Sequence, residues 1–274
     1  MTTTVDGMKV YMLHLGDMWS DSTYSALGDT GATVDNPNAP HRMVQTPSTC
    51  FLIDHPQCGW ILFDTGMPDD PQAAWPTWYH AGIKWTKPEE TKMVNQLAKV
   101  GVKPEDIKYV VSSHLHFDHI GGDCHFAKTA DFIVSKADAE HAYRLVLGSD
   151  DDTQRGYYIR GEVLQERKSV RYIEKDTMNL FPGIDAYILP GHTPGILALH
   201  VHLKDRDLFL AEDALNEKRN YWNGMLPGGA WDTVGYRASV AKMHEICDPI
   251  DALVVYGHDF EQFCEMKKAP EYYE

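Results

Sequence analysis

Three histidines and an aspartate lie within six residues near the middle of the chain, in the segment from His114 to His119 (HLHFDH). Imidazole and carboxylate groups are the ligands expected for zinc, iron or manganese in proteins. Burying so many of them together without a partner would be costly. Alternate residues of extended backbone point to one side, so His114 and His116 share a side, and Asp118 and His119 follow after a turn. The spacing therefore predicts a metal site, with a second ion within reach of Asp118 and His119.

Four further polar residues lie at the ends of short apolar runs: Asp64, His192, Asp213 and His258. Three of them stand beside glycines, in the segments DTG, GHTPG and GHD, and glycine lets the backbone turn sharply at a strand end. Independent strand ends that gather His and Asp at one edge of a sheet are typical of a metal cleft. The sequence therefore predicts one site built from all of these residues.

The elements that must position this site alternate along the chain. Apolar runs predict strands at residues 8–13, 49–54, 60–64, 107–112, 132–135, 186–189, 197–203, 208–211 and 252–256. Helical spacing of apolar residues predicts helices at residues 88–100, 137–147 and 233–247. Interspersed strands and helices favour an α/β fold of sheets covered by helices. The segments 16–47 and 148–170 have no period, and we expect them to be irregular loops.

The composition excludes several classes of protein. The chain has 274 residues, 43% of them hydrophobic, which is typical of a globular protein, and we expect one domain over residues 1–274. A net charge of −15 argues against nucleic-acid binding, and the absence of a long apolar run argues against a membrane span. Five scattered cysteines and an N-terminus without secretory features predict reduced thiols and a cytoplasmic protein.

Two other groups of residues have alternative interpretations. Met67, Trp75 and Trp78 are too apolar for an ordinary exposed loop, so they form either a core patch or an acyl-binding cleft. His200 and His202 alternate on the strand predicted at residues 197–203 and share one side of it. We expect that side to face solvent and do not assign these two histidines a ligand role.

The motifs HLHFDH, DTG, GHTPG and GHD, together with Asp213, resemble those of the metallo-β-lactamase-fold hydrolases over residues 8–258. The resemblance implies an αββα sandwich, with two mixed β-sheets flanked by helices and a dinuclear site at its edge. It implies that one metal is held by His114, His116 and His192, and the other by Asp118, His119 and His258. It further implies that Asp213 bridges both metals and that Asp64 supports the site without binding metal. Zinc is favoured, with iron, manganese and cobalt as alternatives.

Within this superfamily the chain most resembles the N-acyl homoserine lactonases, because TPSTCFLI at residues 46–53, ILFDTGMP and HLHFDHIGG occur in their order. This resemblance implies a quorum-quenching lactonase that opens a lactone ring by attack of a metal-bridging hydroxide on the ester carbonyl. Asp118 or Asp213 would carry a proton to the leaving alkoxide. The lactonases often have a tyrosine where this chain has Asn216, and Tyr221 is a candidate to replace it.

Other activities of the same fold remain as alternatives: a different esterase, a phosphotriesterase or a thioesterase. We expect a small lactone or ester as the partner, no nucleic acid or membrane, and a monomer or a homodimer.

Overall fold

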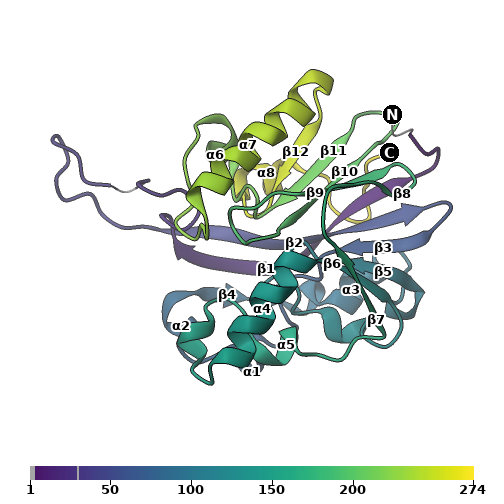
Figure 1. The fold of residues 1–274 in the computed structure, drawn as a ribbon, viewed down its shortest axis with the longest axis horizontal. Helices are drawn as coiled ribbons and strands as arrows, with labels where there is room; N and C mark the ends of the chain where they lie inside the picture. The colour runs from purple at the N-terminus through teal and green to yellow at the C-terminus, as the bar shows by residue number, and fades with distance from the viewer. Residues whose placement is uncertain (1–3, 30) are drawn as a thin grey trace.

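In the computed structural model, which describes residues 4–29 and 31–274, two β-sheets pack face to face and helices cover both outer faces (Figure 1). In spatial order, the larger sheet contains β4 (Lys84–Thr86), β1 (Lys9–Asp21), β2 (Met43–His55), β3 (Gly59–Phe63), β5 (Ile107–Val111), β6 (Asp131–Ser135) and β7 (Ser169–Ile173). The smaller sheet contains β12 (Leu253–Tyr256), β11 (Leu208–Glu212), β10 (Leu197–Val201), β9 (Ile184–Ile188) and β8 (Thr177–Phe181). Both sheets mix parallel and antiparallel pairs. The predicted αββα sandwich is confirmed.

Two helices are long, α4 (Lys136–Gly148) and α7 (Thr233–Cys247). The other α-helices are short: α1 (Pro71–Ala74), α2 (Tyr79–Gly82), α3 (Met93–Ala98), α5 (Arg160–Val163), α6 (Lys218–Trp222) and α8 (Phe260–Glu265). α3 and α4 lie on the outer face of the larger sheet, and α7 lies on the outer face of the smaller sheet (Figure 1). Among the described residues, no helix is both long and apolar enough to cross a membrane.

The core between the sheets explains why these strands are so apolar. Val10, Phe51 and Ile61 of the larger sheet are buried against Leu197 and Leu210 of the smaller one. Side chains on the opposite faces of the same strands pack under helices, so both faces of each sheet are covered. Strands buried on both faces lose the alternation of apolar and polar residues and become continuous apolar runs. That property made the strand predictions at residues 107–112, 197–203 and 208–211 accurate to within two residues.

Three sequence predictions about the elements were wrong in whole or in part. The two ends of the segment 16–47 are not irregular, because β1 continues to Asp21, β2 begins at Met43, and the two strands pair in a long antiparallel hairpin. The described residues between Asp21 and Met43 remain outside strands, as predicted, and part of this connection projects from the body of the protein (Figure 1). Tertiary pairing here outweighs the low strand propensity of Gly and Asp.

The segment 148–170 is not an exposed loop, because it contains α5 and the buried side chains of Arg155 and Tyr158. The helix predicted at residues 88–100 is reduced to α3, since Lys92 is extended.

Candidate functional site

The predicted His and Asp residues follow strands that end at one edge of the sandwich. β9, β11 and β12 run in the same direction, because β10 is antiparallel to both β9 and β11, and β11 is parallel to β12. His192, Asp213 and His258 come directly after these three strands. β5 of the larger sheet leads into the segment from His114 to His119. The packing of the two sheets brings both groups of residues together.

A first cluster consists of His114, His116 and His192, all buried. The Nδ1 atom of His116 lies 3.0 Å from Nε2 of His114 and 3.0 Å from Nε2 of His192. Three ring nitrogens that converge in this way offer three lone pairs to one point, which is the arrangement that a metal ion requires.

A second cluster consists of Asp118, His119 and His258, which are also buried. The Oδ2 atom of Asp118 lies 3.5 Å from Nε2 of His258 and 3.8 Å from Nε2 of His119. One carboxylate oxygen and two imidazoles are again a suitable donor set for a divalent metal.

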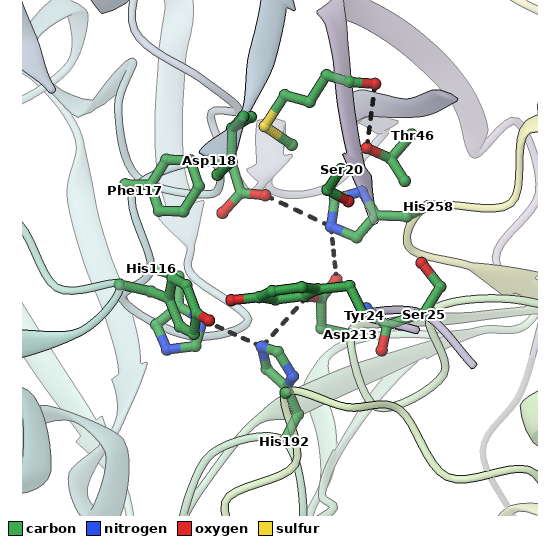
Figure 2. Close-up of a pocket in the computed structure, with 15 residues that line it drawn as sticks. Ser20, Tyr24, Ser25, Thr46, His116, Phe117, Asp118, His192, Asp213 and His258 are labelled. Carbon is green, nitrogen blue, oxygen red and sulfur yellow. Dashed lines mark hydrogen bonds and ion pairs between the residues drawn. The ribbon is translucent and has the colours of Figure 1, made fainter. Parts of the chain in front are cut away.

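Asp213 lies between the two clusters and touches both (Figure 2). Its Oδ1 atom is 3.0 Å from Nε2 of His258 and 3.4 Å from Nε2 of His119, and its Oδ2 atom is 3.2 Å from Nε2 of His192. The two oxygens of one carboxylate therefore face different clusters, which is the position of a bridging ligand.

Asp64 lies behind the second cluster. Its Oδ2 atom is 2.8 Å from Nδ1 of His119, and its two oxygens accept hydrogen bonds from the backbone N–H and the hydroxyl of Ser113. A carboxylate that accepts the second N–H of a metal-binding imidazole fixes the tautomer and the orientation of the ring. Asp64 occupies that place for His119.

Glu212 is a buried residue of the site that the sequence analysis missed. Its Oε2 atom lies 3.8 Å from Nδ1 of His119, beside the contact that Asp64 makes. Asp64 and Glu212 both have a positive φ, 63° and 46°, at the points where β3 and β11 end. A left-handed residue other than glycine costs about 1–2 kcal/mol, so the surrounding structure holds the backbone in a strained turn at the site. The only feature of the sequence that could have pointed to Glu212 is its position directly before Asp213.

Glycines before two of the histidines permit close approach of the backbone. A Cβ atom at Gly257 would lie 2.5 Å from Oδ1 of Asp213, and one at Gly191 would lie 2.6 Å from Cα of Tyr236. Such distances are well below van der Waals contact, so neither position has room for a side chain.

The histidines of the site differ in their protonation states. Burial and the neighbouring histidines lower the pKa of His114 and His116 well below the usual range, so both rings are neutral. Burial acts to raise the pKa of Asp213, but His258, His119 and His192 hold it well below its usual range. Burial opposes a charge on His258 as well, yet Asp213 raises the pKa of that ring to about 9. Despite burial, the neighbouring carboxylates also raise the pKa of His119 well above its usual range. Neutral imidazole and ionised carboxylate are the forms that bind metals, so His114, His116 and Asp213 already have the binding form, whereas His119 and His258 would release a proton when a metal binds.

Unpartnered atoms test whether a metal would fit. Nε2 of His119 and Oδ1 of Asp213 face the clusters, and although both atoms are buried, neither has a hydrogen-bond partner. Buried polar atoms in proteins almost always have partners, and an orphaned one calls for an explanation such as an ion. Two bound ions account for the convergence of His nitrogens and Asp oxygens, so the residues fit a dinuclear centre.

Members of both clusters line one pocket: His116, Asp118, His192, Asp213 and His258 (Figure 2). Met18, Ile83 and Phe117 give its wall an apolar character, and the phenol rings of Tyr24 and Tyr157 lie beside the clusters. The ring centroid of Tyr157 is 5.2 Å from that of His116 and 5.7 Å from that of Tyr24. Sequence reasoning missed both tyrosines, because they lie in the two segments predicted to be irregular.

The apolar residues proposed from the sequence lie behind this wall. Met67 and Trp75 are buried in a cluster with Met18 and Phe117, and the ring centroids of Trp75 and Phe117 are 4.8 Å apart. Trp78 is 37% exposed and packs edge-on against Tyr79. Of the described residues that line the pocket, none is Met67, Trp75 or Trp78. The geometry thus favours the core-patch interpretation over direct contact with a ligand.

Asn216 lines the pocket, as expected, but Tyr221 does not replace the missing tyrosine. The hydroxyl of Tyr221 donates a hydrogen bond to Asp248, and its ring stacks on His244 at 3.9 Å. The helix α6 turns that side chain into the cluster beneath α7 and away from the pocket. The side chain of Asn216 is buried, and its Oδ1 atom has no partner.

Comparisons with known proteins agree with the fold and with the two His/Asp clusters. Residues 43–258 match the model of the metallo-beta-lactamase superfamily. An N-acyl homoserine lactonase of Bacillus sp is 32% identical over 88% of this chain and 92% of its own length. The N-acyl homoserine lactonase AiiB of Agrobacterium fabrum is 28% identical over 96% of this chain and 98% of its own.

A solved structure shows the same fold over the whole chain. It is an N-acyl homoserine lactone hydrolase with the product N-hexanoyl-L-homoserine bound at its catalytic metal centre. It has a TM-score of 0.81 and 28% identity, and the match covers all of both chains. From the matched model, the fold and the two buried clusters, the chain belongs to the metallo-beta-lactamase superfamily as a hydrolase-fold protein related to the N-acyl homoserine lactonases.

Proposed function

We propose that this protein is a metal-dependent lactonase that opens the ring of N-acyl homoserine lactones. One observation carries the proposal: Asp213 joins two buried His/Asp clusters at the floor of a pocket whose wall is largely apolar. Such a floor suits hydrolysis of an ester, and such a wall suits an acyl chain. The lactonases that match this chain along most of its length support the choice of substrate.

His114, His116 and His192 would hold one divalent ion, and Asp118, His119 and His258 would hold the other, with Asp213 shared. When bound, such a pair supplies Lewis acidity toward the carbonyl and lowers the pKa of water to near neutrality. Asp64 contacts the Nδ1 atom of His119 and so fixes the orientation of that ring before a substrate binds. We propose zinc as the metal, with iron, manganese and cobalt as alternatives that the same donors accept.

Asp118 is the residue placed to move a proton. Its carboxylate lines the pocket, and its Oδ2 atom faces His258 across 3.5 Å. A carboxylate beside the reacting ester can accept a proton from the attacking water and return it to the ring oxygen as that bond breaks. Asp213 is fixed by three histidines and is less free to serve in this way.

Asn216 can recognise the amide of the substrate. Its Oδ1 atom is a buried hydrogen-bond acceptor without a partner, and it lines the pocket. An N-acyl homoserine lactone carries an amide N–H next to the ring, and a donor that reaches this oxygen relieves the cost of leaving it unpaired. The backbone carbonyl of Asn216 accepts a hydrogen bond from the N–H of His258, which fixes the amide beside the second cluster.

Tyr24 and Tyr157 are the phenols that could bind the carbonyl oxygen in place of the family's tyrosine. Both line the pocket, and Tyr157 lies against the ring of His116. A phenol hydrogen bond to a substrate oxygen contributes about 0.5–1.5 kcal/mol net. Orientation of the ester therefore depends on these two residues and not on Tyr221.

A phosphotriester is uncharged and needs no basic group for binding, so the phosphotriesterase alternative is decided by the substrate panel below. Charged phosphate esters are less favoured, because Arg42 and Arg219 in the cavity beside the pocket both contact Asp29.

The test is a substrate panel on protein reconstituted with zinc, manganese or cobalt. The panel contains N-acyl homoserine lactones with 4 to 12 acyl carbons, γ- and δ-lactones, a phosphotriester, a thioester and a β-lactam. Ring opening of the homoserine lactones is expected to have the highest kcat/KM, measured by proton release. Asp213→Asn should abolish it, whereas Asp150→Asn, an exposed control, should not. If every lactone remains at the buffer rate while another substrate turns over, the lactonase proposal fails.

A further inference from the structure

A second group of His and Asp residues lies at the other end of the smaller sheet, away from the pocket. Asp185 of β9 and His200 of β10 are direct cross-strand partners. His202 and Asp207 stand at the two ends of the connection between β10 and β11. Because β9 and β11 run toward the pocket, residues at the start of these strands lie at the opposite edge of the sheet.

These four side chains contact one another. The Nε2 atom of His200 and the Nδ1 atom of His202 are each 2.9 Å from Oδ2 of Asp207. The Nε2 atom of His202 is 3.0 Å from Oδ2 of Asp185. His200 and Asp185 are buried, and the side chain of His202 is only 15% exposed. The prediction that both histidines face solvent was wrong, because the connection and the neighbouring strand cover them.

Hydrogen bonding alone does not complete this cluster. If every contact were a hydrogen bond, His202 would need a proton on both ring nitrogens, and His200 would need one on Nε2. The Nδ1 atom of His200 would then be a buried lone pair, and no hydrogen-bond partner is found for that atom.

We propose that Asp185, His200 and His202 form a second metal site, for a divalent first-row ion such as zinc. One donor atom from each of the three lies within 4.8 Å of the others. Oδ2 of Asp185 and Nε2 of His202 face each other at 3.0 Å, and we infer that His200 supplies the third donor through Nδ1, the ring nitrogen that has no hydrogen-bond partner. The ion neutralises the two carboxylates of the cluster, and no imidazolium is needed.

Asp207 then acts as the residue that positions both rings. Its Oδ2 atom accepts the Nε2–H of His200 and the Nδ1–H of His202, which leaves the other nitrogen of each ring free to bind the ion. Carboxylates commonly fix metal-binding histidines in this manner. Asp185 is held in a similar way, because its Oδ1 atom accepts a hydrogen bond of 2.6 Å from the backbone N–H of Asn179.

The role that follows is structural. The three ligands come from β9 and from β10 with the residue just after it, and Asp207 comes from the residue before β11. An ion there would link three neighbouring strands at the edge far from the catalytic centre. Binding to the folded state alone stabilises it by mass action. This site does not depend on the proposed lactonase activity.

The test is the number of zinc ions bound per chain. The protein is equilibrated with zinc, unbound zinc is removed, and the bound metal is counted by elemental mass spectrometry. The parent protein should hold three ions. His202→Gln should hold two, with an unchanged rate on whichever ester the pocket accepts. His41→Gln, a change at an exposed histidine, should hold three. Equal counts in the His202→Gln variant and the parent protein would overturn the site.

Two further measurements test the site even if the His202→Gln variant folds poorly. Asp207→Asn keeps the shape of the side chain and loses the charge, so it should weaken binding of the third ion by about 10–100-fold while far-UV circular dichroism stays unchanged. Zinc should also raise the Tm of the parent protein more than that of Asp207→Asn. An identical zinc affinity and Tm shift in both proteins would contradict the positioning role and the site with it.

Discussion

The two ends of the smaller sheet gather the same residue types in different ways. At the pocket, the ligands come from segments between His114 and His258, and they meet only when both sheets are packed. At the far end, Asp185, His200 and His202 belong to neighbouring strands and lie within 18 residues of one another. Closing a long loop costs more conformational entropy than closing a short one. The catalytic end is therefore a property of the whole fold, whereas the far end is a local property of one part of the sheet.

The largest effect that would sharpen this comparison is expected from Asp213→Ala. Loss of a residue that merely orients a ligand typically costs 10–100-fold, so loss of the shared ligand should lower kcat/KM by more than about 100-fold. The count of zinc ions should fall from three to one, because the far end keeps its ion. A variant that retains both catalytic ions would show that Asp213 is not shared.

A smaller effect is expected from Asp64→Asn. Its Oδ2 atom no longer accepts the N–H of His119 if the amide presents its NH₂ group, so the ring loses its orientation. We expect metal affinity at the second cluster to fall by about 10–100-fold, and the far end to be unaffected. Zinc titration against a competing chelator measures both sites at once. Asp176→Asn, at a half-exposed aspartate, serves as the control.

Asn216→Ala should have a modest effect that is confined to the substrate. Loss of one hydrogen bond of about 0.5–1.5 kcal/mol corresponds to roughly a 2–13-fold decrease in kcat/KM. The decrease should appear with N-acyl homoserine lactones and be absent with γ-lactones that have no amide, while the zinc count remains three. Equal losses with both substrates would show that Asn216 acts on the metal end and not on the amide.

Lys87 is a buried basic group outside both His/Asp clusters, and it can be compared with them as a charge that is stabilised by hydrogen bonds instead of metal ligands. Its Nζ donates hydrogen bonds to the carbonyls of Leu15 and Met67, and burial lowers its pKa to about 8. Between pH 8 and about 10.5 the unfolded chain binds more protons at this residue, so stability should rise with pH by at most about 3 kcal/mol. Lys87→Met should remove that rise, as measured by urea unfolding at pH 8, 9 and 10. An unchanged difference between the two proteins across this range would mean that the lysine is not desolvated.

The sequence predicted that the His and Asp residues at the pocket meet at one edge of the sandwich, because each of them follows the end of a strand. His192, Asp213 and His258 each follow a continuous apolar run, and the direction of those runs brings them together. The same reasoning missed Tyr24 and Tyr157, which lie in segments without a period and reach the pocket only through tertiary packing. It also misplaced His200 and His202, because the covering of a sheet face is decided by distant elements.

The close packing at Gly191 and Gly257 has a consequence for how this protein can change. Because neither position has room for a Cβ atom, the backbone that presents His192 and His258 offers almost no tolerated substitutions. Tyr24, on the pocket wall, is 38% exposed and meets no such restriction. Laboratory evolution toward a new ester should thus accumulate its changes at the wall, leaving the two histidine turns as the invariant part of every successful lineage.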